Sequence, residues 1–273
     1  MAGRLIDCHA HIIDPARFPL PGGPGYKPRP EETGTREAYG AMLDELGAPH
    51  ALLVQPSGYG VDNRAMLDAM KASPGRFKGI AMVDPGASDR TLEALLEAGV
   101  VGVRFNLPSY DPDALGHPEA PALLERLRAL GLFAQVYAHD AQWAAIAPVL
   151  RKSRVRVLVD HFGAHDLAGG VDQPGFRAVL ALGREGQASV KLSAAYRLSR
   201  KPGYEDLEPF AEAILGAFGT GSCMWGSDWP FLGVSARPDL APSFTALRRW
   251  LPDSRDRQRI LWDNPFRLFR FGD

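Results

Sequence analysis

Histidine and carboxylate side chains occur in three short segments that lie far apart in the chain. His9 and His11 are separated by one residue near the N-terminus. His161 follows an aspartate in the middle of the chain, and Asp228 lies in a Trp-Gly-Ser-Asp-Trp-Pro run near its end. In a β-strand, residues i and i+2 point to the same face, so His9 and His11 would enter one space. Such groups can bind a divalent metal ion or polarise a water molecule, although an isolated His-x-His pair is often only two polar side chains at a strand end.

The segments that must position these residues alternate regularly along the chain. Short apolar runs predict eight strands, at Arg4–His9, Ala51–Gln55, Phe77–Val83, Val100–Asn106, Leu132–Tyr137, Arg156–His161, Ser189–Ser193 and Cys223–Asp228. Most are continuous aliphatic runs, typical of strands covered by helices on one face and by a packed interior on the other. Segments with helical periodicity lie between them, such as Asp89–Ala98 and Pro121–Leu130. Gly99 and Gly131 follow these two segments, where a helix end favours a left-handed residue.

This alternation over eight units predicts one (β/α)8 barrel, or TIM barrel, as a single domain over residues 1–273. The length of 273 residues is close to the roughly 250 of such a barrel. An open, doubly wound sheet is the alternative, but no glycine-rich nucleotide-binding motif follows the first strand. In a barrel the carboxyl ends of the strands meet at one mouth, so the three segments that carry chemistry would converge there.

The stretch from residue 14 to residue 35 differs from the rest of the chain because it is rich in proline and glycine. Neither a long helix nor a strand is expected to run through it. It directly follows the first predicted strand, which places it at the rim of the mouth. The stretch is therefore either a lid over the pocket or a plain surface loop.

Composition excludes several classes of partner. The chain has 31 Lys and Arg residues against 32 Asp and Glu residues, so no basic stripe is available to neutralise the phosphates of a nucleic acid. It has no apolar run of about 18 residues that could span a membrane, and the first predicted strand begins too early to leave room for a signal peptide. A homo-oligomer is compatible with the sequence.

The two cysteines, Cys8 and Cys223, fit neither a metal site nor a disulfide framework. A reduced, cytoplasmic setting is therefore expected. Cys8 has the opposite strand parity to His9 and His11, which predicts that it packs against the helix layer and is not a nucleophile.

Four motifs spread over the whole chain resemble the amidohydrolase superfamily, and within it the amidohydrolase-2 branch. They are DCHAHI at Asp7–Ile12, DHFG at Asp160–Gly163, WGSDWP at Trp225–Pro230 and DNPFRLF at Asp263–Phe269. Three further runs are similar to the 2-pyrone-4,6-dicarboxylate lactonase-like group of that branch. These runs are VQPSGYGVDN at Val54–Asn63, GVRFN at Gly102–Asn106 and KLSAAYRLS at Lys191–Ser199.

The resemblance implies a catalytic cluster made of His9, His11, His161 and Asp228. Asp228 would be the general base that takes a proton from water and then returns it to the leaving oxygen. His161 would polarise the substrate carbonyl or bind a metal ion. Without the resemblance, Asp228 could equally be a helix cap or an ion-pair residue.

Other residues at the predicted strand ends are candidates for substrate binding. Arg104 and Arg197 could bind a substrate carboxylate through two parallel hydrogen bonds, although an arginine alone is more often a surface ion-pair partner. The hydroxyl groups of Ser57, Tyr59 and Tyr137 could orient a ring or stabilise an oxyanion.

The chain departs from the lactonase group at two places. Tyr59 occupies a position where that group has a histidine, and no arginine occurs in residues 107–111, where the group has one. Fewer cations therefore face the substrate. A monocarboxylate lactone, or one with different substituents, is expected rather than a dianionic pyrone dicarboxylate.

The metal content is open at this stage. Superfamily members often have a carboxylated lysine or a glutamate at the end of the fourth strand, where this chain has Arg104, and Tyr137 occupies the place of the usual fifth-strand histidine. His9, His11 and Asp228 could hold one Zn or Mn ion, or the cluster could work without metal, which we favour. The expected reaction is hydrolysis of the C–O ester bond of a small carboxylated lactone. The alternatives are metal-dependent decarboxylation of an aromatic or unsaturated acid, and a barrel without catalytic activity.

Overall fold

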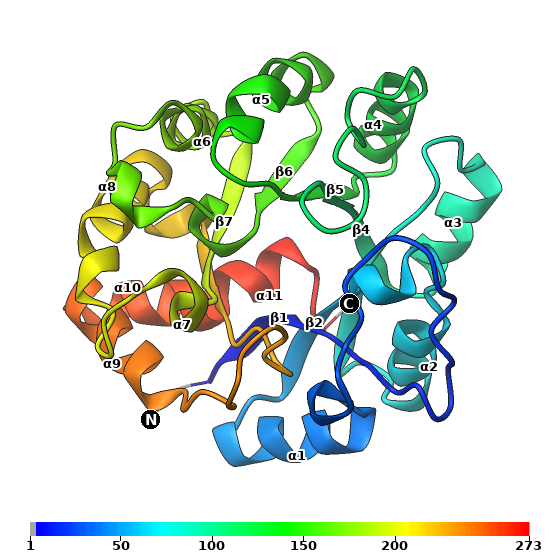
Figure 1. Cartoon of the computed structure of the whole chain (residues 1–273), viewed down its shortest axis with the longest axis horizontal. Coiled ribbons are helices and arrows are strands. Elements are labelled where there is room, and N and C mark those ends of the chain that lie inside the picture. The colour runs from blue at the N-terminus through cyan, green and yellow to red at the C-terminus, as the bar shows by residue number, and fades with distance from the viewer. Residues whose placement is uncertain (1–3, 273) are drawn as a thin grey trace.

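The computed structural model describes residues 4–272, and this part of the chain contains eight parallel strands around one barrel (Figure 1). The strands neighbour one another in sequence order: β1 (Ile6–Ala10), β2 (His50–Val54), β3 (Phe77–Ala81), β4 (Val100–Asn106), β5 (Phe133–Tyr137), β6 (Arg156–Val159), β7 (Ala188–Ser193) and β8 (Cys223–Gly226). The predicted (β/α)8 barrel is confirmed. The sixth and eighth strands end two residues earlier than predicted, so His161 and Asp228 lie just beyond the sheet.

Helices surround the strands on the outside (Figure 1). The outer ring consists of α1 (Arg36–Leu46), α2 (Arg64–Ala72), α3 (Asp89–Glu97), α4 (Ala120–Ala129), α5 (Ala141–Ser153), α6 (Pro174–Arg184), α8 (Glu208–Phe218) and α9 (Ala241–Trp250). The short helix α7 (Ala195–Leu198) follows β7, and α10 (Ser254–Gln258) and α11 (Asn264–Leu268) lie near the end of the chain. Gly99 and Gly131 have φ values of 92° and 68°, as their predicted places at helix ends require. No helix in residues 4–272 is long and apolar enough to cross a membrane.

The barrel closes where the ends of β1 and β8 approach each other. The backbone N–H of Asp228 donates to the carbonyl oxygen of His9 at 2.8 Å, and that of His11 donates to the carbonyl of Trp229 at 2.8 Å. A Cβ atom at Gly226 would lie 2.8 Å from both the backbone nitrogen and the Cβ of His9. Only glycine permits this approach, which brings the segments that contain His9 and Asp228 side by side.

Asp7 reinforces this closure from the side of the helices. Its buried carboxylate accepts hydrogen bonds from the backbone N–H of Ser227 at 2.8 Å, from the hydroxyl group of Ser227, and from the hydroxyl group of Tyr39 in α1 at 2.9 Å. The first strand, the end of the last strand and the first helix are thus tied to one side chain.

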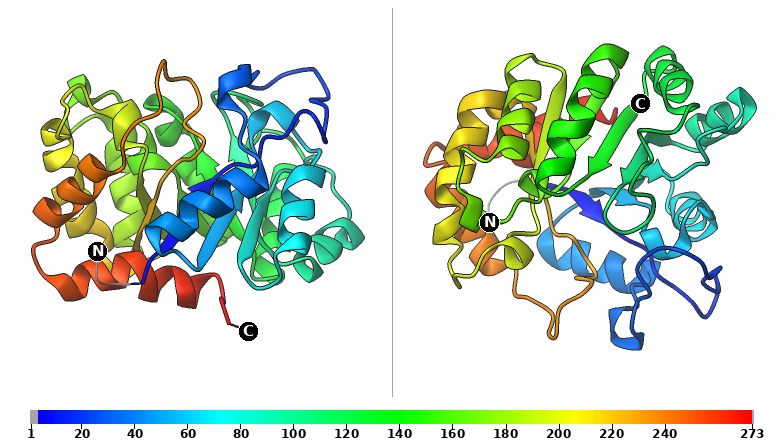
Figure 2. Two further views of the ribbon diagram at one scale, coloured as in Figure 1. Left: turned by 90° about the horizontal axis from the view of Figure 1, so that it is seen from below. Right: turned by 45° about the horizontal axis from the view of Figure 1, so that its top comes forward.

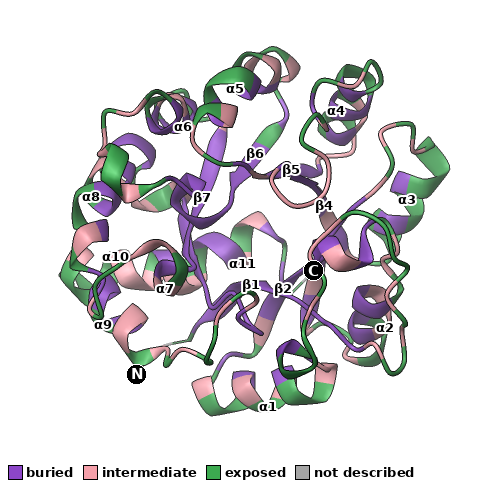
Figure 3. Ribbon diagram, viewed as in Figure 1, coloured by how far each residue is buried: buried purple, intermediate pink, exposed green. Residues whose placement is uncertain are grey.

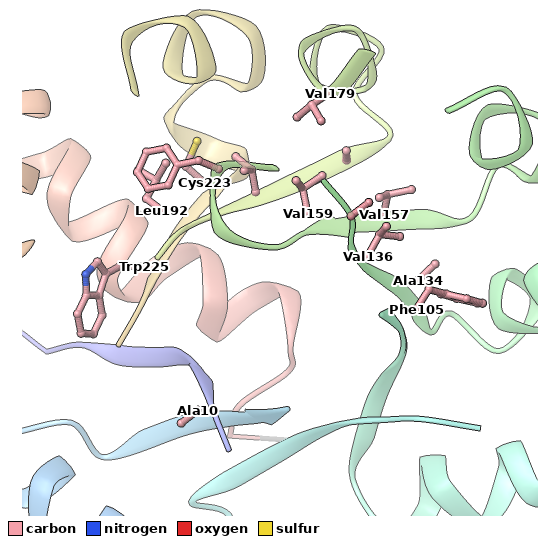
Figure 4. Packing of buried hydrophobic residues seen from close by; sticks show 14 of the residues in the cluster. Ala10, Phe105, Ala134, Val136, Val157, Val159, Val179, Leu192, Cys223 and Trp225 are labelled. Carbon is pink, nitrogen blue, oxygen red and sulfur yellow. The ribbon is translucent and has the colours of Figure 1, made fainter. Parts of the chain in front are cut away.

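Buried residues are concentrated in the strands, whereas the helices also carry exposed residues (Figure 3). Apolar side chains among the buried residues form two separate clusters. The larger cluster lies between strands and helices, where Val157 and Val159 of β6 pack with Val179 of α6 (Figure 4). The smaller lies inside the barrel and contains side chains of β1, β2, β3, β5, β6 and β8 together with Phe269 and Phe271 after α11. The end of the barrel opposite the mouth is therefore closed by the C-terminal segment.

Cys8 lies in this inner apolar cluster, with Ile6 and Leu52, and not against the helices as its parity predicted. The pairing of β1 with β2 is irregular between Asp7 and Ala10. This irregularity interrupts strict alternation, so Cys8 and the following His9 both reach the interior. The expectation for Cys8 was wrong because it assumed a regular strand.

The stretch of residues 14–35 contains one short 3-10 turn, η1 (Pro30–Glu32), and a bridge between Ile13 and Gly34 borders it. In the left view of Figure 2 this stretch, in blue, and the segment after β8, in orange, rise at the end of the barrel opposite the red C-terminal helices. The buried Glu32 connects them, since its carboxylate accepts from the hydroxyl group of Tyr26 at 2.8 Å and from the backbone N–H of Gly233 at 2.7 Å. For this stretch, a lid over the pocket and a plain surface loop both stay predictions.

Candidate active site

The carboxylate of Asp228 lies at the centre of the histidine cluster. Its Oδ1 atom is 3.7 Å from the Nε2 atoms of His9, His11 and His161 in turn. All four side chains are buried at the mouth of the barrel, and they come from the ends of β1, β6 and β8. The structure thus brings together the four residues that the sequence assigned to one cluster.

Two of these residues have an unusual backbone conformation. The φ angles of His161 and Asp228 are 50° and 63°, in the left-handed region that costs non-glycine residues energy. At these residues the chain leaves β6 and β8 abruptly, and the side chains point into the mouth. Such strain persists where surrounding contacts impose it, and it is concentrated at functional sites.

The second oxygen of Asp228 is held by neighbours on α7. Its Oδ2 atom accepts a hydrogen bond from the hydroxyl group of Tyr196 at 2.7 Å and one from the guanidinium group of Arg197 at 3.4 Å. Burial alone would raise the pKa of the Asp228 carboxyl group, but interaction with the imidazole of His161 and with the guanidinium group of Arg197 outweighs burial and holds this pKa well below its ordinary value. Asp228 is therefore a carboxylate at neutral pH, with Oδ1 free to face the imidazoles.

The Nδ1 atom of each imidazole has its own partner. In His11 it lies 2.7 Å from the carbonyl oxygen of Val54, and in His161 it lies 2.8 Å from the hydroxyl group of Ser193. Burial lowers the pKa of both His11 and His161 to about 4, and it lowers the pKa of His9 well below the ordinary value. The three rings are consequently neutral at pH 7.

A layer of charged residues lies inside the barrel beneath the cluster, and sequence analysis missed its importance. The Oδ2 atom of Asp160 accepts from Gln135 at 3.1 Å and from the Nη2 atom of Arg104 at 3.3 Å, while its Oδ1 atom lies 3.3 Å from the ammonium group of Lys191. Lys191 also lies 3.2 Å from the Nδ1 atom of His9. The sequence indicated this charged layer only through strand parity, since its residues occupy inward positions of their strands.

A cavity of 80 Å³ opens beside the cluster. It is lined by His11, Tyr26, Pro56, Ser57, Arg104, Asn106, Ser109, Tyr137, His161, Arg197, Asp228 and Leu232. Four predicted binding residues, Ser57, Arg104, Tyr137 and Arg197, therefore reach the cavity. Tyr26, Asn106 and Ser109 are additional lining residues that the sequence analysis did not identify.

Two predicted site residues do not line this cavity. Tyr59 is buried and its hydroxyl group donates to the carbonyl oxygen of Phe18 at 2.8 Å, so it supports the stretch of residues 14–35. His9 lies behind the cavity wall, between Asp228 and the charged layer. A larger groove of 690 Å³ beside the start of β1 is lined by several arginines and Asp263 but by no histidine among the described residues, so the cluster of histidines with a carboxylate lies at the mouth and not in the groove.

The lowered pKa values of the buried imidazoles predict how stability depends on pH. Between pH 6.5 and about 4, His11 and His161 bind protons in the unfolded chain but not in the folded one. We therefore expect the free energy of unfolding to fall as the pH falls through this range. Urea denaturation at closely spaced pH values measures it. A His11→Asn/His161→Asn double variant should show a shallower dependence, and a wild-type stability that stays constant over this range would contradict the prediction.

Comparison with known proteins shows to which family the chain belongs. A family model described as amidohydrolase matches residues 6–271. The chain belongs to the amidohydrolase family. Among its relatives in this family, the 2-pyrone-4,6-dicarboxylate hydrolase of Comamonas testosteroni is 32% identical over 97% of this chain and 89% of the relative. The 4-sulfomuconolactone hydrolase of Hydrogenophaga intermedia is 31% identical over 96% of this chain and 88% of the relative.

Solved structures agree with this membership. A probable 2-pyrone-4,6-dicarboxylic acid hydrolase from Acinetobacter baumannii, with citric acid bound, superposes with a TM-score of 0.88 at 29% identity. The match covers 98% of this chain and 99% of that one. The relatives of this amidohydrolase chain therefore include lactone hydrolases that share its fold over almost the whole length.

The donor atoms at the mouth are suited to a metal ion. One ligand atom each of His9, His161 and Asp228 lie within 4.8 Å of one another, whereas the sequence had grouped His11 with His9 and Asp228. The Nε2 atom of His9 is buried without a hydrogen-bond partner in residues 4–272. His9, His161 and Asp228 could thus hold one divalent ion, which when bound would lower the pKa of a water molecule.

Proposed function

We propose that this amidohydrolase hydrolyses the C–O ester bond of a small carboxylated lactone, with a water molecule activated at Asp228. The observation that carries the proposal is the Oδ1 atom of Asp228, held 3.7 Å from the Nε2 atoms of three imidazoles beside a cavity. The lactone hydrolases among the relatives support the same chemistry.

The geometry divides the work between the two oxygens of Asp228. Because Tyr196 and Arg197 hold Oδ2, Oδ1 is the oxygen that accepts a proton from water. Water adds to the lactone carbonyl carbon as Asp228 takes this proton, and an N–H group of His161, which lines the cavity, stabilises the negative oxygen that forms. The ring C–O bond then breaks, and Asp228 returns the proton to the leaving oxygen. The product is a hydroxy acid, and Asp228 is a carboxylate again.

The charges around the cavity favour a substrate with one carboxylate. In the described network, Arg104 and Lys191 pair with Asp160, and Arg197 pairs with Asp228. Three cations thus face two carboxylates, and one positive charge is left over for a substrate carboxylate. Arg104 and Arg197 both line the cavity and are the residues that we assign to this anion.

We propose that turnover needs no bound metal. Arg104 occupies the fourth-strand position where a bridging ligand would be expected, and its guanidinium group forms an ion pair with Asp160. Tyr137 ends the fifth strand, and its ring lies 5.5 Å from that of His161. Neither residue adds a ligand to the histidine cluster.

Chelation of metal tests this proposal directly. We expect the purified protein, stripped with EDTA and checked by elemental analysis, to hydrolyse five- and six-membered lactones that carry one carboxylate at the untreated rate. Acid release is followed in a pH-stat, with added zinc and manganese as controls. Loss of activity that the ions restore would contradict metal independence, and carbon dioxide release from aromatic acids would support decarboxylation instead. Failure to hydrolyse any lactone of the panel would overturn the proposed function.

A further inference from the structure

We propose that His9 and His11 act with opposite polarity at the mouth, because Lys191 makes His9 a hydrogen-bond donor while the carbonyl of Val54 makes His11 an acceptor. The inference rests on the proposed hydrolysis for its catalytic meaning. Lys191 is then a positioning residue, and the two histidines, which look equivalent in the sequence, carry their protons on different nitrogen atoms.

The partner of His11 determines where its proton lies. The Nδ1 atom of His11 is 2.7 Å from the carbonyl oxygen of Val54. A carbonyl oxygen only accepts hydrogen bonds, so Nδ1 must carry the proton. A neutral imidazole has one N–H, and the Nε2 atom of His11 therefore presents a lone pair towards Asp228, 3.7 Å away.

The partner of His9 imposes the opposite arrangement. The ammonium group of Lys191 has three N–H bonds and no lone pair. Its neighbours are the Oε1 atom of Gln135 at 2.7 Å, the Nδ1 atom of His9 at 3.2 Å and the Oδ1 atom of Asp160 at 3.3 Å. The Oε1 atom of Gln135 accepts one N–H bond, the carboxylate of Asp160 lies at ion-pair distance, and the Nδ1 atom of His9 can accept another N–H bond.

A competing arrangement would place the proton of His9 on Nδ1, which also lies 3.3 Å from the Oδ1 atom of Asp160. Two donors, the ring N–H and the Lys191 ammonium group, would then face each other at 3.2 Å. Lys191 is fully buried and has no room to turn to solvent. The proton of His9 therefore lies on Nε2, which is also the buried atom that has no hydrogen-bond partner within residues 4–272.

This polarity separates two tasks at the mouth. The Nε2–H group of His9 faces the Oδ1 atom of Asp228 at 3.7 Å and can hold this carboxylate in place. The lone pair of His11 and the Oδ1 atom of Asp228 can accept hydrogen bonds from the two O–H groups of the attacking water, and Asp228 then takes one proton. A protonated Nε2 atom cannot bind a metal ion, so Lys191 also opposes metal binding at His9.

Nitrogen NMR of protein labelled with ¹⁵N-histidine tests the tautomers without measuring activity. We expect the wild-type protein at pH 7.5 to show the Nε2–H form for His9 and the Nδ1–H form for His11, with signals assigned through the His9→Asn and His11→Asn variants. In Lys191→Met, His9 should change to the Nδ1–H form and donate to Asp160. Its affinity for zinc chloride, measured by competition with a chromophoric chelator, should rise about 10- to 100-fold, the usual effect of a partner that orients a metal ligand.

Ser193→Ala is the matched control, because it removes the Nδ1 partner of His161 and should leave the tautomer of His9 unchanged. A wild-type His9 in the Nδ1–H form overturns the inference, as does a folded Lys191→Met protein with unchanged tautomer and zinc affinity. If Lys191→Met does not fold, the wild-type spectrum decides alone. Failure of lactone hydrolysis would overturn the proposed function but leave the tautomers as they are, so the two failures are distinguishable.

Discussion

Asp228→Asn should lower kcat/KM for lactone hydrolysis by about 100- to 10,000-fold, the usual cost of losing a general base. Asparagine has nearly the same shape, so the hydrogen bond from Tyr196 can persist while the proton acceptor is lost. Initial rates in the pH-stat, with substrate varied around KM, measure the effect. The circular dichroism spectrum and thermal unfolding should remain close to those of the wild-type protein.

A matched variant separates this effect from a general loss of charge. Asp172 is exposed in a turn before α6, and Asp172→Asn makes the same chemical change outside the histidine cluster and the cavity lining. We expect wild-type rates for this control. Wild-type rates in Asp228→Asn itself would exclude Asp228 as the base.

Arg104→Met should raise KM for a carboxylated lactone by about 10- to 100-fold, because a hydrogen bond to a charged group contributes about 1.5–3 kcal/mol. The methyl ester of the same lactone lacks the anion and should show a much smaller change. Comparison of KM values for acid and ester in both proteins therefore isolates the carboxylate contact. An equal increase for both substrates would remove Arg104 from the binding role.

The same substitution also affects the charged layer. Removing Arg104 leaves Asp160 paired with Lys191 and hydrogen-bonded to Gln135. We expect a measurable loss of stability, since breaking a buried ion pair leaves charge less well compensated. Thermal unfolding of Arg104→Met establishes that the kinetic comparison is made on folded protein.

Local patterns in the sequence were sufficient to predict the barrel. Continuous apolar runs indicated strands buried on both sides, and Gly99 and Gly131 marked helix ends at positions where the structure has left-handed residues. These features depend on neighbours within a few residues, so a single sequence contains them. Strand parity also indicated that His9 and His11 would share a space with residues from other strand ends.

Strand parity predicted the wrong side for Cys8, and position along the chain did not show which group Tyr59 would contact. Cys8 lies inside the barrel because the pairing of β1 is irregular. Tyr59 supports the stretch of residues 14–35 and does not line the cavity, because its hydroxyl group donates a hydrogen bond to the carbonyl oxygen of Phe18. Neither outcome could be read from residue types and spacing.

The sequence by itself determined which residues meet, since the strand order of a barrel brings His9, His11, His161 and Asp228 to one mouth. Only the tertiary structure decided what each of them can do there. The proton on His11 is placed by a carbonyl 43 residues away, and that on His9 by an ammonium group 182 residues away. An imidazole donates or accepts according to the atom opposite it, and that atom is known only when the chain has folded.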